Sequence, residues 1–240
     1  MPSSNIGDYL VSSRSFEEYQ AMFALPDDVK GPVLDCPGGG SSFTASANAR
    51  GIEALAVHPV YELTPDDLSA RIAAEVGRGR LWASENAQRY VWDFYGDVAG
   101  HTRVRSESAA LFGSDYRHHP ELYRCARLPE LPFPDNAFGL VLSSHLLFTY
   151  ADRLDVGFHV AALLEMVRVS FDDVRVFPLL DMAGRNVDAM VDAVTAELAK
   201  RGIEAQRVRV RYEFQRGGDE MLVVRDAVRS VRTRGDGGDR

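Results

Sequence analysis

The residues with the clearest capacity for chemistry form a glycine turn directly after a short apolar run. Val33–Asp35 reads as a buried strand, and Cys36, Pro37 and the three glycines Gly38–Gly40 follow it. Glycine lets the backbone approach a ligand closely and adopt positive φ angles. A helix starting at Phe43 would turn its free N–H groups and the positive end of its dipole toward the same place. This order of elements predicts a binding site for a nucleotide-like cofactor.

A histidine at the end of another apolar run is the second candidate. The run Gly139–Ser143 reads as a strand, and Ser144 and His145 come directly after it. The pKa of an unperturbed imidazole lies near neutrality, so His145 is a candidate general base. A histidine that only hydrogen-bonds the backbone at the end of a strand would give the same pattern. The sequence leaves both interpretations open.

The glycine turn does not fit the best-known nucleotide motifs. In the pattern G-x-G-x-x-G, Gly38 and Gly40 fill the first two positions and Phe43 fills the third. The third glycine permits close packing of helix and strand, so phenylalanine there weakens a dinucleotide interpretation. No Gly-Lys-Ser/Thr follows, which excludes a phosphate-binding Walker loop. A nicotinamide-dependent oxidoreductase is therefore a disfavoured alternative.

The elements that must position these residues alternate between short apolar runs and amphipathic segments. This alternation predicts an α/β fold, a doubly wound and mostly parallel sheet. Gly217, Gly218 and Asp219 are a hairpin signal between the last two strands, so the sheet should end with one antiparallel strand. Strands are expected over 32–35, 52–57, 123–126, 139–143, 174–177, 205–214 and 220–224, and helices over 43–50, 155–169 and 186–201, with an earlier helix that a capping box starts at Ser15 and Pro26 ends.

A block near the middle of the chain departs from this alternation. Helices are expected from Thr64 to about Val76, over 81–98 and over 106–116, and the second is rich in aromatic residues. We interpret residues 62–120 as a helical insertion or lid; the aromatic side chains could equally serve only to pack it onto the core. The predicted organisation is an arm and helix over 1–30, a domain over 31–225 and a flexible tail over 226–240.

Composition restricts the range of functions. The 240 residues include 27 basic and 35 acidic side chains, a net charge of −8, which gives no reason to expect nucleic-acid or anionic-membrane binding. The two cysteines, the absence of a signal-peptide pattern and the lack of a long apolar stretch favour a cytoplasmic protein. No metal site is expected, since His118, His119 and Asp115 lack further ligands at suitable spacing.

The stretch Leu131–Ser144, which reads LPFPDNAFGLVLSS, resembles the class I S-adenosylmethionine-dependent methyltransferases that act on small molecules. With the glycine turn as the first motif, the resemblance covers about residues 30–225 outside the helical block. It implies a seven-stranded sheet that ends in an antiparallel seventh strand. It also implies S-adenosylmethionine as cofactor and a small-molecule methyl acceptor, whose identity and methylated atom stay open, as does the oligomeric state.

The resemblance also assigns roles to residues. The methyl-transfer site would include His145 and Tyr150, which follow the fourth strand. Pro37 departs from the family's first glycine, His58 replaces the carboxylate that usually holds the ribose, and Arg127 replaces another acidic residue. These departures leave open a catalytically inactive protein that binds the same or a related ligand for regulation. The cofactor site would comprise Arg14 (for the methionine carboxylate), Asp35, Cys36, Pro37, Gly38, Gly39, Gly40, His58, Pro59, Arg127, Leu128, Ser143 and Ser144.

Overall fold

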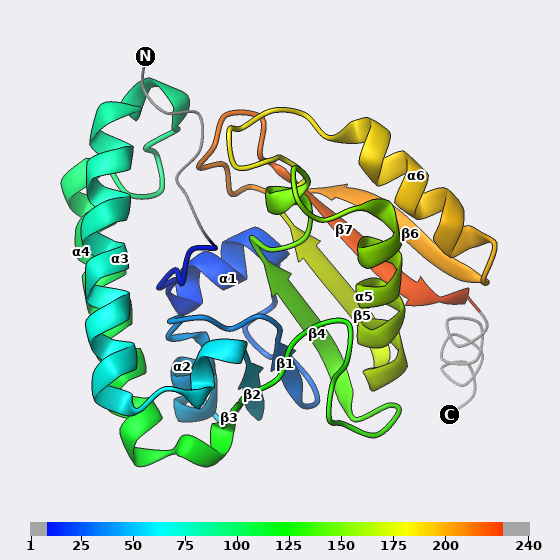
Figure 1. The fold of residues 1–240 in the computed structure, drawn as a ribbon, viewed down its shortest axis with the longest axis horizontal. Helices are drawn as coiled ribbons and strands as arrows, with labels where there is room; N and C mark the ends of the chain where they lie inside the picture. Colours follow the sequence, from blue (N-terminus) through cyan, green and yellow to red (C-terminus); the bar gives the residue numbers. More distant parts are fainter. Residues whose placement is uncertain (1–8, 228–240) are drawn as a thin grey trace.

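A computed structural model describes residues 9–227 of the chain and contains one seven-stranded sheet (Figure 1). The strand order is β3-β2-β1-β4-β5-β7-β6. The first five strands in this order run parallel to one another, and β7 is antiparallel to both β5 and β6. The strands are β1 Val33–Asp35, β2 Ala54–Val57, β3 Tyr123–Arg124, β4 Phe138–Ser144, β5 Ser170–Phe177, β6 Ile203–Arg209 and β7 Glu220–Asp226. The predicted fold class is thereby confirmed, including the antiparallel strand.

The sheet is covered by helices on both faces, as Figure 1 shows. Successive side chains of a strand point to opposite faces of the sheet, so each strand contributes to the packing on both faces. On one face, Leu34 and Val141 join a core cluster with α5 Val156–Val169 and α6 Asp188–Ala199. On the other, Val33 and Leu142 pack with α1 Phe16–Phe23 and α2 Phe43–Ala49. Short 3-10 turns η1–η4 occupy Pro59–Glu62, Ala87–Arg89, Pro120–Leu122 and Phe148–Tyr150.

The helical block after β2 consists of two long helices, α3 Pro65–Glu85 and α4 Val98–His118. They lie side by side along one flank of the molecule, near the carboxyl ends of the parallel strands (Figure 1). A third core cluster joins them to the β2 region through Leu68, Ile72 and Phe112. The expected helix over 81–98 is wrong: α3 continues from Val76 to Glu85, and residues 90–97 are irregular.

The aromatic residues of that irregular segment pack rather than form a helix. Tyr90 stacks on Phe214 with ring centroids 4.4 Å apart, and Tyr95 contacts Tyr212. The Asp97 side chain then accepts from the Gly100 N–H at 2.7 Å and starts α4. Tertiary contacts with the C-terminal strands therefore override the local helical pattern.

The ends of the chain are described in part. The arm from residue 9 to Ser15 crosses the glycine turn before α1 begins, and the Ser15–Glu18 capping box forms as expected. Strand β7 extends to Asp226, and the rest of the predicted tail, 228–240, lies outside the described residues. Within residues 9–227, no helix is both long enough and apolar enough to cross a bilayer.

Candidate functional site

The largest hollow described here lies at the carboxyl ends of β1, β2 and β4, with a volume of about 460 Å³. We call it the larger cavity. Because the strand order reverses between β1 and β4, this edge is the topological switch point, where open α/β sheets bind ligands. Nine of the predicted cofactor residues line it: Cys36, Pro37, Gly38, Gly39, His58, Pro59, Arg127, Leu128 and Ser144.

The glycine turn is shaped mainly by its protein neighbours. A Cβ on Gly40 would lie 2.7 Å from Ile72 Cδ1 of α3, and one on Gly38 would lie 2.6 Å from the Tyr61 hydroxyl. Gly39 has a φ of +58° and faces the Ser12 carbonyl of the arm. Gly38 and Gly39 line the larger cavity, whereas Gly40 does not. Only part of the turn is therefore available to a ligand.

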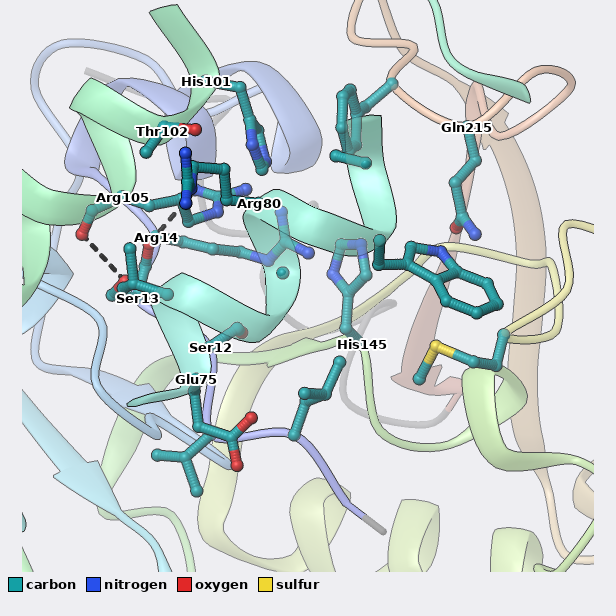
Figure 2. A pocket seen from close by; sticks show the side chains of 18 of the residues that line it. Ser12, Ser13, Arg14, Glu75, Arg80, His101, Thr102, Arg105, His145 and Gln215 are labelled. Carbon is teal, nitrogen blue, oxygen red and sulfur yellow. Dashed lines mark hydrogen bonds between the residues drawn. The ribbon is translucent and has the colours of Figure 1, made fainter. Parts of the chain in front are cut away.

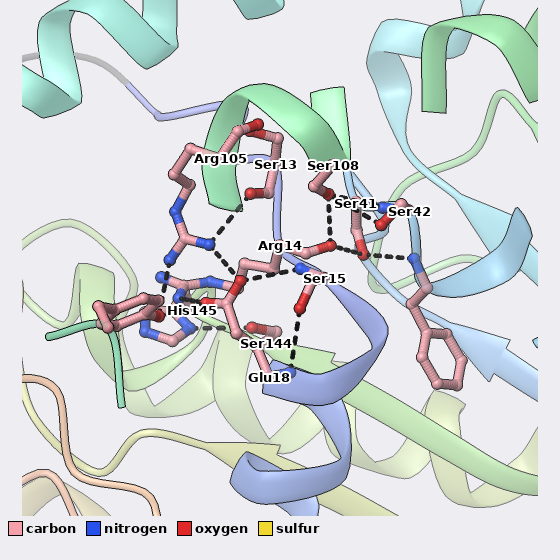
Figure 3. Close-up of polar contacts among 12 residues, drawn as sticks. Ser13, Arg14, Ser15, Glu18, Ser41, Ser42, Arg105, Ser108, Ser144 and His145 are labelled. Atoms are coloured by element: carbon pink, nitrogen blue, oxygen red, sulfur yellow. Dashed lines mark hydrogen bonds and ion pairs between the residues drawn. The ribbon is translucent and has the colours of Figure 1, made fainter. Parts of the chain in front are cut away.

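The start of α2 is covered by the arm. The Ser42 N–H donates to the Arg14 carbonyl at 3.0 Å and to the Ser108 hydroxyl, and the Gly40 N–H donates to the Ser12 carbonyl (Figure 3). Within the helix itself, the Phe43 N–H donates to the Ser41 hydroxyl at 3.0 Å, so the expectation of a free N–H group is wrong at Phe43. The N–H groups of Gly40 and Ser42 lie just before the helix and are taken up by backbone carbonyls of the arm.

The carboxylate of Asp35 binds an aromatic residue, Tyr19, and does not line the larger cavity. Its carboxylate accepts from the Tyr19 hydroxyl at 2.9 and 3.1 Å, and its side chain is buried. Burial raises the pKa of Asp35 to about 7, because water no longer solvates the ionised form. Asp35 does not line the larger cavity, although it closes the strand that leads into it.

His58 presents a donor to the cavity. Its Nδ1 accepts from the Val60 N–H at 3.0 Å, and burial together with the charge of Arg71 lowers its pKa to about 4. The neutral ring therefore carries its proton on Nε2. The acceptor nitrogen of His58 is thus already used to cap η1, so towards a ligand the ring offers a donor.

Two charged residues that sequence reasoning missed also line this part of the cavity. Glu62 ends η1, four residues after His58, and its exposed carboxylate reaches the cavity; Arg71 lies on α3. Glu62 is an acidic residue close to the end of the second strand, where His58 stands in place of a carboxylate. In the sequence, Glu62 lies four positions after His58, because the short turn Pro59–Glu62 separates it from the end of β2.

His145 lies where the larger cavity meets a second one. Its φ is +53°, and its N–H donates to the Phe177 carbonyl at 2.7 Å, which fixes the turn after β4. Its Nδ1 pairs with the Ser144 hydroxyl at 2.8 Å. Burial, and then the charges of Arg14 and Arg105, lower the pKa of His145 well below its usual value. The ring is neutral at pH 7 and a weaker base than the sequence suggested.

The second hollow, which we call the smaller cavity, has a volume of about 130 Å³. Figure 2 shows many of its lining side chains. They come from the arm, α3, α4, the turn after β4, and the loops that contain Tyr90, Met182 and Phe214–Gln215. His145 and Tyr150 line both cavities, and the Tyr150 hydroxyl holds the arm by accepting from the Leu10 N–H at 2.8 Å. Of the predicted site residues, Arg14 lines only the smaller cavity, and Asp35, Gly40 and Ser143 line neither.

A buried ionic cluster forms the back of the smaller cavity. The Glu18 carboxylate is fully buried and binds Arg105, Arg14 at 3.3 Å, the Tyr95 hydroxyl at 2.5 Å and the Ser15 N–H at 2.8 Å. Burial alone would raise the pKa of Glu18, but the two guanidinium groups lower it to about 2. The cluster ties the arm and α1 to α4 (Figure 3). Within residues 9–227, no group of three or more metal-ligating side chains is present.

The position of β7 decides the fold type. This strand lies between β5 and β6 and runs against both, in a sheet ordered β3-β2-β1-β4-β5-β7-β6. The chain has the class I methyltransferase fold. The larger cavity lies at the carboxyl ends of the first, second and fourth strands of this sheet, and the smaller one adjoins it at the turn after β4.

Comparisons with known proteins give few named relatives. No family model matches the chain. An uncharacterised protein of Methanocaldococcus jannaschii, MJ0045, is 28% identical over an alignment of 228 positions, which covers 92% of this chain and 98% of that protein. Among solved structures, the PH0226 protein of Pyrococcus horikoshii has a TM-score of 0.45 at 12% identity, over 88% of this chain and 89% of that one.

Two further solved structures are a methyltransferase and a bifunctional protein with a methyltransferase part, according to their descriptions. A SAM-dependent methyltransferase of Methanosarcina mazei has a TM-score of 0.42 at 9% identity, over 83% of this chain and 92% of that one. WbdD, described elsewhere as a bifunctional kinase-methyltransferase, has a TM-score of 0.44 at 10% identity, over 88% of this chain. The chain spans 39% of the length of WbdD.

Proposed function

We propose that this protein transfers a methyl group from S-adenosylmethionine to a small-molecule acceptor. One observation carries the proposal: the larger cavity, at the switch point of the sheet, meets the smaller cavity at His145 and Tyr150. A donor in one hollow and an acceptor in the other would face each other across these two side chains. Methyl transfer depends chiefly on this kind of alignment.

The residues of the larger cavity fit the cofactor. Its volume of about 460 Å³ lies within the range of roughly 300 to 1,000 Å³ that is usual for small-molecule sites. Glu62 and the Nε2–H of His58 offer an acceptor and a donor for the two ribose hydroxyls. Arg127 and Leu128 would flank the adenine, and the backbone of Gly38 and Gly39 would lie against the amino-acid part of the cofactor.

Bound S-adenosylmethionine supplies an electrophilic methyl group on a positively charged sulfur. The chain would position the two reactants, shield them from water and provide a proton acceptor. The arm, held by the Tyr150 hydroxyl, lines both cavities with Leu10 and Ser12 and would limit the access of water to bound reactants. When Nδ1 of His145 donates to the Ser144 hydroxyl, Nε2 is free to take the proton that the acceptor loses as its new bond to the methyl carbon forms.

The test is calorimetric titration of the full-length protein with S-adenosylhomocysteine. We expect binding to one site, and Glu62→Gln should weaken it about tenfold, because hydrogen bonds to a charged group contribute about 1.5 to 3 kcal/mol. Glu53→Gln is the matched control, since Glu53 is equally exposed but precedes β2 at the opposite edge of the sheet. No heat at millimolar ligand would refute the function. Unchanged affinity in Glu62→Gln would refute only the role of Glu62.

A further inference from the structure

The smaller cavity has the dimensions of a site for a very small molecule. Its volume of about 130 Å³ is close to that of an engineered cavity of about 150 Å³ that holds one benzene molecule. Trp82 and Tyr90 line it together with Phe214. Flat aromatic walls favour a flat ligand, because ring faces stack on them with little loss of contact.

Positive charge exceeds negative charge around this cavity. Arg14 and Arg105 share the single buried carboxylate of Glu18, so one of the two guanidinium charges is uncompensated. Arg80 adds a third guanidinium from α3 and forms no ion pair within the described residues. The lining carboxylate Glu75 is already bound to Arg78 at 2.9 Å and does not offset this excess.

Buried polar atoms in the lining lack partners. Arg14 is only 8% exposed, and its Nε has no hydrogen-bond acceptor within residues 9–227. The hydroxyl of Thr149, which is 3% exposed, and Nδ1 of His101 lack partners as well. A buried polar group without a partner is costly and rare in a native protein. Figure 2 shows Arg14 and His145 extending into the same space, where a ligand would meet both.

We propose that the methyl acceptor is a small planar carboxylate, about the size of one ring, bound in the smaller cavity by Arg14 and Arg80. This inference rests on the proposed function, because it names the acceptor of that reaction. A guanidinium fork matches the two oxygens of a carboxylate, and the aromatic walls match a ring. The acceptor atom would lie on the side of the ring that faces His145.

A bound carboxylate would also prepare His145 for its role. Arg14 and Arg105 are the charges that, after burial, lower the pKa of His145. An anion on Arg14 would offset that effect and make the imidazole a stronger base. Other charged residues line the two cavities with His145: Glu75 and Arg80 of α3 in the smaller one, and Glu62, Arg71 and Arg127 in the larger one. Glu18 lies behind Arg14 and Arg105 and pairs with both. Binding of the substrate would thus make His145 a stronger base for the reaction.

The inference is tested with benzoate as the probe and benzamide as its uncharged match, each titrated into the full-length protein and followed by tryptophan fluorescence, to which Trp82 of the cavity wall and Trp92 both contribute. We expect benzoate to bind at least about tenfold more tightly than benzamide. Arg80→Gln should weaken benzoate about fivefold or more and leave S-adenosylhomocysteine binding unchanged. Arg103→Gln, an exposed arginine of α4 outside the cavity, should bind benzoate as the wild type does.

Several results would overturn the inference. These are equal binding of the two probes, no benzoate binding at tens of millimolar, inorganic phosphate binding as tightly as benzoate, or unchanged benzoate affinity in Arg80→Gln. Loss of S-adenosylhomocysteine binding in Arg14→Gln, with an unchanged circular-dichroism spectrum, would assign Arg14 to the cofactor instead. If the wild type binds S-adenosylhomocysteine but not benzoate, this inference fails alone. If it does not bind S-adenosylhomocysteine, the proposed function fails too.

Discussion

Replacing Glu18 by glutamine should destabilise the protein strongly, because the substitution removes the only carboxylate between two buried guanidinium groups. The pKa of Glu18 falls from an ordinary value of 4.5 to about 2 in the folded chain. At about 1.36 kcal/mol for each pH unit, this corresponds to roughly 3 kcal/mol of stability at neutral pH. Removing one partner of a buried ion pair typically costs about 3 to 5 kcal/mol, which agrees with this value. Glu18→Gln should therefore lower the free energy of unfolding by about 3 kcal/mol.

The pH dependence gives this prediction its sign. Because the folded pKa lies below the unfolded one, the stabilisation is complete above about pH 5 and is lost as the pH falls toward 2. Urea unfolding, followed by circular dichroism at pH 7, 5 and 3, measures it, and the gap between wild type and Glu18→Gln should narrow at the lowest pH. Glu17→Gln, an exposed neighbour, should change stability by less than about 0.5 kcal/mol. A loss below about 1 kcal/mol in Glu18→Gln, or a gap that does not vary with pH, would refute the reasoning.

Two further substitutions test the glycine turn and the strand before it by the same unfolding assay. Asp35→Asn should be more stable than the wild type by up to roughly 4 kcal/mol at pH 8 and by little at pH 4, because the raised pKa of about 7 makes ionisation of Asp35 unfavourable in the folded chain. A difference that does not grow with pH would contradict this. Gly40→Ala should lose about 1 to 3 kcal/mol, since the new Cβ would lie 2.7 Å from Ile72 Cδ1. Its control, Gly77→Ala on the open side of α3, should gain up to about 1 kcal/mol; equal effects of the two would disprove the packing argument.

Local patterns predicted the sheet well, because each strand carries its own signal. The strand predicted over Gly139–Ser143 has an uninterrupted apolar centre, Leu140–Leu142, and the hairpin glycines Gly217 and Gly218 predicted the antiparallel end of the sheet. The helical block was predicted less well. The helix expected to end at about Val76 in fact runs to Glu85, where it packs along α4. Residues 90–97 follow contacts with Phe214 that no local pattern reveals.

The site residues likewise differ in how far the sequence predicts their positions. Residues at strand ends, such as His58, Ser144 and His145, follow from the order of elements, because parallel strands bring their ends to one edge. The positions of Glu62 and Arg80 do not. They depend on the course of a short turn and on where the insertion packs, and both are set by contacts between segments far apart in the chain. Charge composition was equally uninformative, since a chain of net charge −8 encloses a cavity with an excess of arginine.

The most direct test of the proposed methyl transfer is a crystal structure of the full-length protein grown with saturating S-adenosylhomocysteine. We predict that the adenosine lies beside His58 and Glu62 in the larger cavity, and that the sulfur faces His145 at the junction with the smaller one. Density for the ligand outside the larger cavity, or a sulfur that faces away from His145, would contradict the account.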